Sequence, residues 1–172
     1  MNGGDTPKDE IRVLLSRVAE AVSLSWAIYE PGNAWPVAYA DASREALCGF
    51  ARRASITSGR CRDEEGRMAE RAIESGQVQR GTCWQGTMRW VFPMSVAGQV
   101  VMAVAICGFG VDPEAQATDY LPQDIAEALG LPTGVDRSSA FPRDSVAAPQ
   151  GAAMVAAVLE KALQALLVSR GF

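Results

Sequence analysis

The sequence predicts one α+β domain in which a central antiparallel sheet is flanked by helices. Three observations lead to this prediction. The chain has 172 residues, a length that suits one hydrophobic core. Apolar residues recur at helical spacing near both ends and at strand spacing between them. The strand-like runs come in two pairs, each joined by a short turn, and helical stretches separate the pairs, as in α+β proteins.

The first predicted helix covers residues 8–22, because one face of it is apolar. The apolar residues on that face are Ile11, Leu14, Leu15, Val18 and Val22. Residues 1–7 are polar, and we expect them to be disordered. Strand-like runs follow at residues 24–29 and 35–40. Between them, Pro31 presets φ and Gly32 tolerates a positive φ, so this segment is typical of a turn.

Helices are predicted after this first hairpin. Asp41 or Ser43 can cap a helix that carries apolar side chains through residue 51. Asp63 can cap another helix, which runs to Ser75 and ends at Gly76, since glycine is the usual residue after a helix end.

The second predicted hairpin contains the most hydrophobic strands. Within residues 88–94, the even positions are all large and apolar: Met88, Trp90, Phe92 and Met94. Residues 96–100 supply a tight turn. Residues 100–107 form a continuous apolar run, which is typical of a central strand covered on both faces. We expect Gly108-Phe109-Gly110 to end this strand.

The C-terminal third is predicted to be helical at both ends. A short helix covers residues 121–129 and stops at Gly130 and Pro132. A loop with Phe141-Pro142 leads to a final helix over about residues 152–168, which is apolar almost all round and therefore buried, here or against a partner. We expect the first and last helices to pack in a homodimer, because exposing such a helix is unfavourable.

Composition and charge remove several classes of function. The sequence has no histidine, which excludes mechanisms that need an imidazole, and we expect no enzyme. The net charge is −4 without any basic block, so we expect no binding to nucleic acid. No apolar run is long enough to cross a bilayer and the N-terminus shows no secretory signal. We therefore expect a cytoplasmic protein that does not bind membranes.

The four cysteines are Cys48, Cys61, Cys83 and Cys107, and none forms a CxxC pair. Cys107 lies inside a strand and is expected to behave as a small hydrophobe. The other three lie near turns or element ends, and arginines close to Cys61 and Cys83 favour the thiolate. If these three converge, they can bind a metal or an iron–sulfur cluster. Purely structural thiols are the alternative.

Six segments follow one another along these elements, namely LCGFARR, GRCRDEE, CWQG, VFPMSVAGQVV, DIAEALGLP and SSAFPRDS. In these segments and in the order of its elements the chain resembles GAF and PAS-type sensory modules, and more narrowly the PocR-type sensory domain of bacterial regulators. The resemblance implies a GAF/PAS-like sheet and a single sensory domain over residues 8–172. The chain departs from the family at Gly108-Phe109, where a Gly-Gln pair is usual, and at Trp84 and Thr87 beside the thiol motif. Both departures bear on the identity of the ligand.

A ligand pocket is predicted on the inner face of the sheet. The residues expected to line it are Cys83, Trp84, Arg89, Trp90, Phe92 and Trp26, with Cys48 and Cys61 opposite. Arg89 is expected to meet a carboxylate or other polar group of the ligand, and the rings to supply apolar area, as in many small-molecule pockets. Packing in the core is the alternative role for Trp90 and Phe92.

We therefore expect a stand-alone PocR/GAF-like sensory domain that binds a small organic ligand or cofactor and signals to an unidentified protein partner. One alternative is a redox protein with a metal or iron–sulfur cluster on Cys48, Cys61 and Cys83. The other is a dimerising scaffold whose pocket has become filled.

Overall fold

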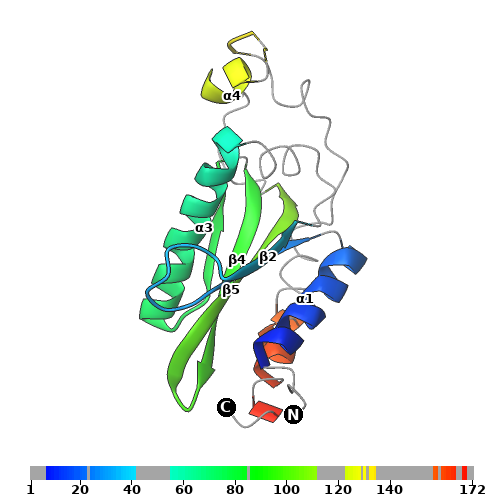
Figure 1. Ribbon diagram of the computed structural model, residues 1–172, viewed down its shortest axis with the longest axis vertical. Coiled ribbons are helices and arrows are strands. Elements are labelled where there is room, and N and C mark those ends of the chain that lie inside the picture. Colours follow the sequence, from blue (N-terminus) through cyan, green and yellow to red (C-terminus); the bar gives the residue numbers. More distant parts are fainter. Residues whose placement is uncertain are drawn as a thin grey trace, which may run out of the picture.

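The structure, a computed structural model, describes residues 7–22, 24–41, 55–84, 86–111, 123–128, 130, 132–134, 157–158, 160–165 and 168–169. Its elements in chain order are α1 (Pro7–Val22), β1 (Ser25–Tyr29), β2 (Ala38–Asp41), α3 (Ser55–Ser75), β3 (Gln79–Thr82), β4 (Thr87–Val96), β5 (Gln99–Val111) and α4 (Gln123–Ala128). The last helical segment comprises the described residues from 157 onward. A five-stranded sheet lies between helices (Figure 1), which confirms the predicted α+β class.

The strands are arranged in the order β2-β1-β5-β4-β3, and every neighbouring pair is antiparallel. The two longest strands, β4 and β5, form a hairpin whose turn is Ala97-Gly98. Both turn residues have positive φ, 50° and 81°, as the tightest hairpin turns require. β5 lies between β1 and β4, and its alternate side chains belong to the two core clusters on opposite faces of the sheet, so its apolar run is covered on both faces.

The two faces of the sheet pack against different helices (Figure 1). Large side chains fill the α1 face: Trp26, Ile28, Met88, Trp90, Phe92, Met94, Met102, Val104 and Ile106. Ile11 and Leu15 of α1 and Leu163 of the last helical segment close this cluster. The α3 face is built mostly from small residues: Ala27, Ala69, Ala72, Ala103 and Ala105. These alanines let α3 lie close to the strands.

The N-terminal elements agree well with the predictions. The predicted helix over residues 8–22 and the strand over residues 24–29 are confirmed as α1 and β1. The predicted turn is present, since the Asn33 amide donates to the Glu30 carbonyl at 3.1 Å and Gly32 has a φ of 79°. β2 is shorter than the predicted strand and begins only at Ala38.

The start of α3 was predicted wrongly. The helix begins at Ser55, so Asp63 lies inside it and does not cap it. A buried stripe with helical spacing begins before Asp63, so the helix includes this residue. The members of the stripe are Cys61, Glu65, Met68, Ala69 and Ala72. The predicted end is confirmed, since Gly76 follows with a φ of 63°.

Two further strand predictions need correction. β5 does not end at Gly108-Phe109-Gly110 but continues to Val111. Val111 still pairs with Thr87 of β4, because the pairing shifts register between Thr87 and Arg89 and leaves the Gly108-Phe109-Gly110 segment out of the regular ladder. β3 was not predicted at all, since its sequence QRGT lacks apolar alternation. The short helix over residues 121–129 is confirmed as α4, whereas the helix through residue 51 and the loop at Phe141-Pro142 lie outside the described residues.

Candidate functional site

The buried polar side chains gather on the α3 side of the sheet. Within the part of the chain that the structure describes, they are Ser25, Glu65, Thr87 and Arg89. Ser25 alternates with Ala27 and Tyr29 along β1, and Arg89 with Val91 along β4, and these neighbours pack against α3. The space under α3 is therefore partly polar, whereas the α1 face is filled by apolar side chains.

Glu65 and Arg89 form an ion pair at the centre of this polar cluster. Arg89 Nε lies 3.7 Å from Glu65 Oε2, and both side chains are 2% exposed. The Tyr29 hydroxyl donates a hydrogen bond of 3.1 Å to the other carboxylate oxygen, Oε1. Removing two charges from water is costly, and only close pairing with additional hydrogen bonds offsets the cost. The pair therefore fixes the position of the Arg89 guanidinium.

The turn between β3 and β4 is fastened to α3 by Trp84. Its indole Nε1–H donates to Cys61 Sγ at 3.3 Å, and its backbone N–H donates to Glu64 Oε2 at 3.1 Å. The Arg60 guanidinium lies 5.3 Å from the centroid of the Trp84 ring, which is a cation–π distance. The turn itself closes with a 2.7 Å hydrogen bond from the Gly86 amide to the Cys83 carbonyl. Trp84 thus covers the Cys61 end of the space under α3.

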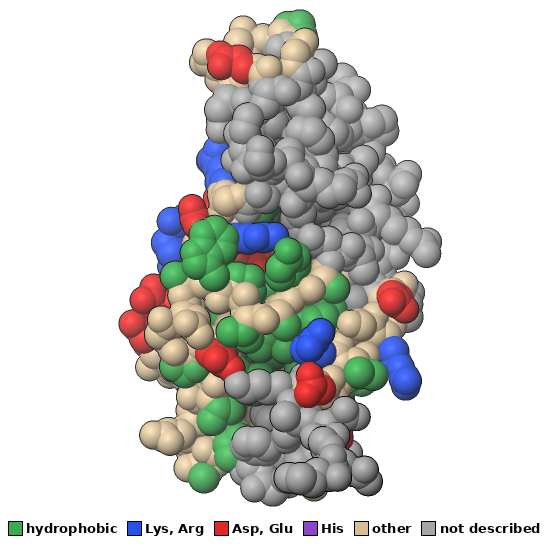
Figure 2. Space-filling view, in the orientation of Figure 1, with side chains coloured by type: hydrophobic (Ala, Val, Ile, Leu, Met, Phe, Trp, Pro, Cys, Tyr) green, Lys and Arg blue, Asp and Glu red, His purple; other side chains and the backbone are tan. Residues whose placement is uncertain are grey.

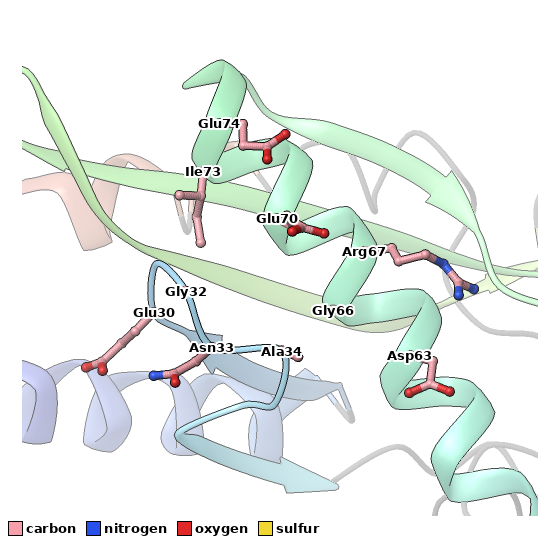
Figure 3. Close-up of a pocket in the computed structure, with 10 residues that line it drawn as sticks. All are labelled: Glu30, Gly32, Asn33, Ala34, Asp63, Gly66, Arg67, Glu70, Ile73 and Glu74. Carbon is pink, nitrogen blue, oxygen red and sulfur yellow. The ribbon is translucent and has the colours of Figure 1, made fainter.

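A groove of about 500 Å³ runs between α3 and the loop that joins β1 to β2 (Figure 3). Its charged lining residues are Glu30, Asp63, Arg67, Glu70 and Glu74. Figure 3 shows Arg67 pointing away from the loop, so the groove presents mainly carboxylates. The loop touches α3 at Gly66, where a Cβ would lie 2.8 Å from the Ala34 carbonyl oxygen. We name this the acidic groove.

Beside the acidic groove, apolar side chains are exposed over β2 and the segment before it. Trp35, Val37 and Tyr39 are each about half exposed, at 54%, 48% and 48%. Figure 2 shows an apolar area in the middle of this face, bordered by basic and acidic side chains. The Arg62 guanidinium of α3 lies 4.5 Å from the centroid of the Tyr39 ring, which links β2 to the helix.

A second groove, of about 230 Å³, lies on the neighbouring flank of α3 and faces β3. Its charged lining residues are Glu64, Arg67, Arg71, Arg80 and Arg89. We name it the basic groove. Arg89 belongs to both the buried ion pair and this groove, so the basic groove leads from the surface to the polar cluster.

The predicted aromatic residues lie on the opposite face of the sheet from Arg89. Trp26, Trp90 and Phe92 belong to the apolar cluster beneath α1 and are 4%, 7% and 1% exposed. Successive residues of a strand point to opposite faces, so Arg89 and its neighbour Trp90 do not line one cavity. The indole N–H of Trp26 has no hydrogen-bond acceptor within the described residues. Whether these rings contact a ligand stays a prediction.

The thiols lie in different elements. Cys61 is inside α3 rather than near an element end, Cys83 is in the turn before β4, and both are buried. Cys107 faces α3 from β5, opposite Arg89. No group of three His, Cys, Asp or Glu side chains within the described residues could hold a metal ion. Cys48 lies outside these residues, so the metal site on Cys48, Cys61 and Cys83 stays a prediction.

Several residues of this region were not predicted, namely Tyr29, Glu65, Arg67 and Arg71. A signal for Glu65 is present in the sequence, because Glu65 occupies a position on the apolar stripe of α3. A charged residue on such a stripe needs a buried partner of opposite charge. Arg89 is the one charged residue within the predicted strand over residues 88–94, and it supplies the opposite charge that Glu65 needs.

A family model described as the sensory domain found in PocR matches residues 7–135. No curated protein and no solved structure matches the chain. Across the described residues, no helix is both long enough and apolar enough to span a membrane.

Proposed function

The chain belongs to the family of sensory domains found in PocR, and from this premise we propose that it is a receptor for a small organic molecule whose site lies on the α3 side of the sheet. The ion pair between Glu65 and Arg89 is the observation that carries the proposal. It puts a directed polar group under α3, and a groove reaches it from the surface.

The chemical makeup of the α3 side supports this location. Sites for small molecules combine apolar walls with a few precisely placed polar groups. Met68, Val91 and the alanines supply apolar area, while Arg89 supplies hydrogen-bond donors in a fixed orientation. The α1 side instead holds large rings and methionines packed against one another, as in an ordinary core.

The proposed role of Arg89 is to orient the ligand. Glu65 and Tyr29 fix the guanidinium from one side, so a ligand that reaches it through the basic groove meets a preorganised group. Preorganised groups lose little conformational freedom on binding, which favours affinity. The turn at Trp84 borders the same region and is the proposed segment that responds to an occupied site.

We propose that the signal passes through a homodimer that uses α1 and the last helical segment. Ile11 and Leu15 of α1 belong to the same core cluster as Leu163 of the last helical segment, and Figure 1 draws both segments on the same side of the sheet. Val13 of α1 and Val158 and Val168 of the last segment are 51%, 62% and 64% exposed. Burying such apolar surface between two copies is favourable. An output protein would then recognise the arrangement of the paired helices by binding to them.

A ligand screen with matched variants tests the proposal. Short diols, carboxylates and phosphate esters are screened by thermal shift, and hits are measured by isothermal titration calorimetry. Arg89→Lys keeps the charge but loses the planar fork, so we expect it to weaken binding by about tenfold or more. Arg12→Lys, on the exposed side of α1, is the control and should bind like the natural chain. Equal affinity in both variants would overturn the location of the site.

A further inference from the structure

We infer that the basic groove binds a small molecule carrying two negative charges, such as a phosphate monoester or a dicarboxylate. The inference rests on the proposed function and deepens it, because it names the chemical class of the ligand. It starts from the charges that line the groove.

The basic groove concentrates positive charge in a chain whose net charge is −4. The guanidinium groups of Arg67, Arg71 and Arg89 face the single carboxylate of Glu64 in this groove. Arg80 also lines it, but its guanidinium lies 5.3 Å from the centroid of the Trp90 ring, its cross-strand partner, and so belongs to the α1 side of the sheet. Glu65, behind Arg89, adds a second carboxylate. Glu65 offsets the charge of Arg89 and Arg60 offsets that of Glu64, so the positive charges of Arg67 and Arg71 remain for a ligand.

The arginines at the rim are available to a ligand. Within the described residues neither Arg67 nor Arg71 forms an ion pair, and both are exposed. The lining carboxylate, Glu64, is already engaged by the Trp84 amide at 3.1 Å and by Arg60 at 3.8 Å. It therefore competes weakly for Arg67 and Arg71.

The depth of the basic groove depends on a glycine. Gly81 of β3 is the cross-strand partner of Arg89, and both line the groove. A Cβ at Gly81 would lie 3.4 Å from the Cε atom of Met68. Because Gly81 has no side chain, the space above Arg89 stays open between Met68 and β3. A larger residue at this position would fill the floor of the groove.

Guanidinium groups lie at both the inner and the outer end of the basic groove, and guanidinium groups bind oxyanions. Arginine binds carboxylates and phosphates through two parallel N–H···O bonds, which fixes orientation as well as charge. Arg89 is 2% exposed and forms the inner end, while Arg67 and Arg71 form the outer end. Thr82 also lines the groove and adds a hydroxyl that can donate to an oxygen. The volume of about 230 Å³ limits the ligand to a small molecule.

The test compares a dianion with its neutral counterpart. Glycerol 3-phosphate and glycerol share a carbon skeleton, and succinate supplies a dicarboxylate. Calorimetry at low salt should detect binding of glycerol 3-phosphate or succinate and none of glycerol. The double variant Arg67→Gln with Arg71→Gln should weaken anion binding by about tenfold or more. Both residues are exposed, so the variant should keep the circular dichroism spectrum and melting temperature of the natural chain.

The matched control removes two positive charges from the other side of the sheet. Arg12→Gln with Arg17→Gln makes the same change in net charge on the exposed face of α1, and it should bind the anions normally. Failure to bind either anion, or equal loss in both double variants, overturns the inference. Neutral molecules that bind through Arg89, without dependence on Arg67 and Arg71, overturn it too but leave the proposed function standing.

Discussion

Arg89 Nε lies 3.7 Å from Glu65 Oε2 in the interior of the domain, and each side chain is 2% exposed. Arg89 comes from the sheet and Glu65 from the helix that covers it. A well-packed apolar pair in the same place is often as stable or more stable. Stability alone therefore does not account for two buried charges at this place. Their proposed role is to hold a guanidinium at the inner end of the basic groove.

Breaking the pair on one side should destabilise the domain. Glu65→Leu or Arg89→Met leaves a buried charge without its counter-charge, and we expect each to lower the free energy of unfolding by about 3–5 kcal/mol. The double variant Glu65→Leu with Arg89→Met leaves no buried charge and should lose less than the sum of the singles. Urea unfolding followed by circular dichroism measures all of them. Strict additivity would show that the two side chains do not interact.

The Tyr29 hydroxyl should contribute a smaller amount. Tyr29→Phe removes the hydrogen bond to Glu65 Oε1 but keeps the ring, which is fully buried. We expect a loss of about 1–3 kcal/mol, because one buried carboxylate oxygen loses its donor. Tyr39→Phe is the control, since Tyr39 is half exposed and should show little change. An unchanged unfolding midpoint for Tyr29→Phe would contradict the observed contact.

Two glycines of the same helix should respond in opposite directions to alanine. Gly66→Ala places a Cβ 2.8 Å from the Ala34 carbonyl oxygen, and we expect a loss of about 1–3 kcal/mol as the loop is displaced. Gly59 has nothing within 4 Å of the equivalent position. Gly59→Ala should therefore stabilise α3 by about 1 kcal/mol through helix propensity. Similar changes in both variants would show that the loop does not press on α3.

Trp84 should protect the Cys61 thiol. Cys61 is 5% exposed and accepts the indole N–H, so Trp84→Ala should open it to solvent. We expect faster reaction of one thiol with a disulfide reagent, since accessible thiols react more readily. The additional variant Cys61→Ser assigns the signal, because it should abolish the fast phase. A rate that Trp84→Ala leaves unchanged would contradict the role of Trp84 as a cover.

The proposed dimer makes a prediction that does not involve the ligand. Val158→Glu puts a charge on an exposed valine of the last helical segment and should yield a monomer by light scattering without loss of fold. Val78→Glu, a similar change at an exposed valine before β3, should leave the oligomer intact. Equal masses for the natural chain and Val158→Glu would remove this helix from the interface.

Both hairpins were predicted because local chemistry determines them. Pro31-Gly32 and Ala97-Gly98 mark the turns, and apolar alternation marks β4. β3 escaped prediction because it is a strand only through its pairing with β4, and QRGT has no pattern of its own. The start of α3 escaped prediction because Asp63 looks like a cap while the apolar stripe actually extends further back.

The arrangement of the side chains around Arg89 was predicted less well because it depends on tertiary packing. Arg89 was identified as a ligand-binding residue, but the neighbouring rings were grouped with it although strand alternation separates them. Its partner Glu65 comes from another element, 24 positions earlier, and only the placement of α3 on the sheet brings them together. Arg67 and Arg71 look like ordinary surface residues until β3 is placed beside them.

A crystal structure of the domain with the tightest-binding molecule from the ligand screen would locate the ligand-binding site. We predict electron density between α3 and the sheet, with a polar group of the ligand within hydrogen-bond distance of the Arg89 guanidinium. Density on the other face, among Trp26, Trp90 and Phe92, would contradict it.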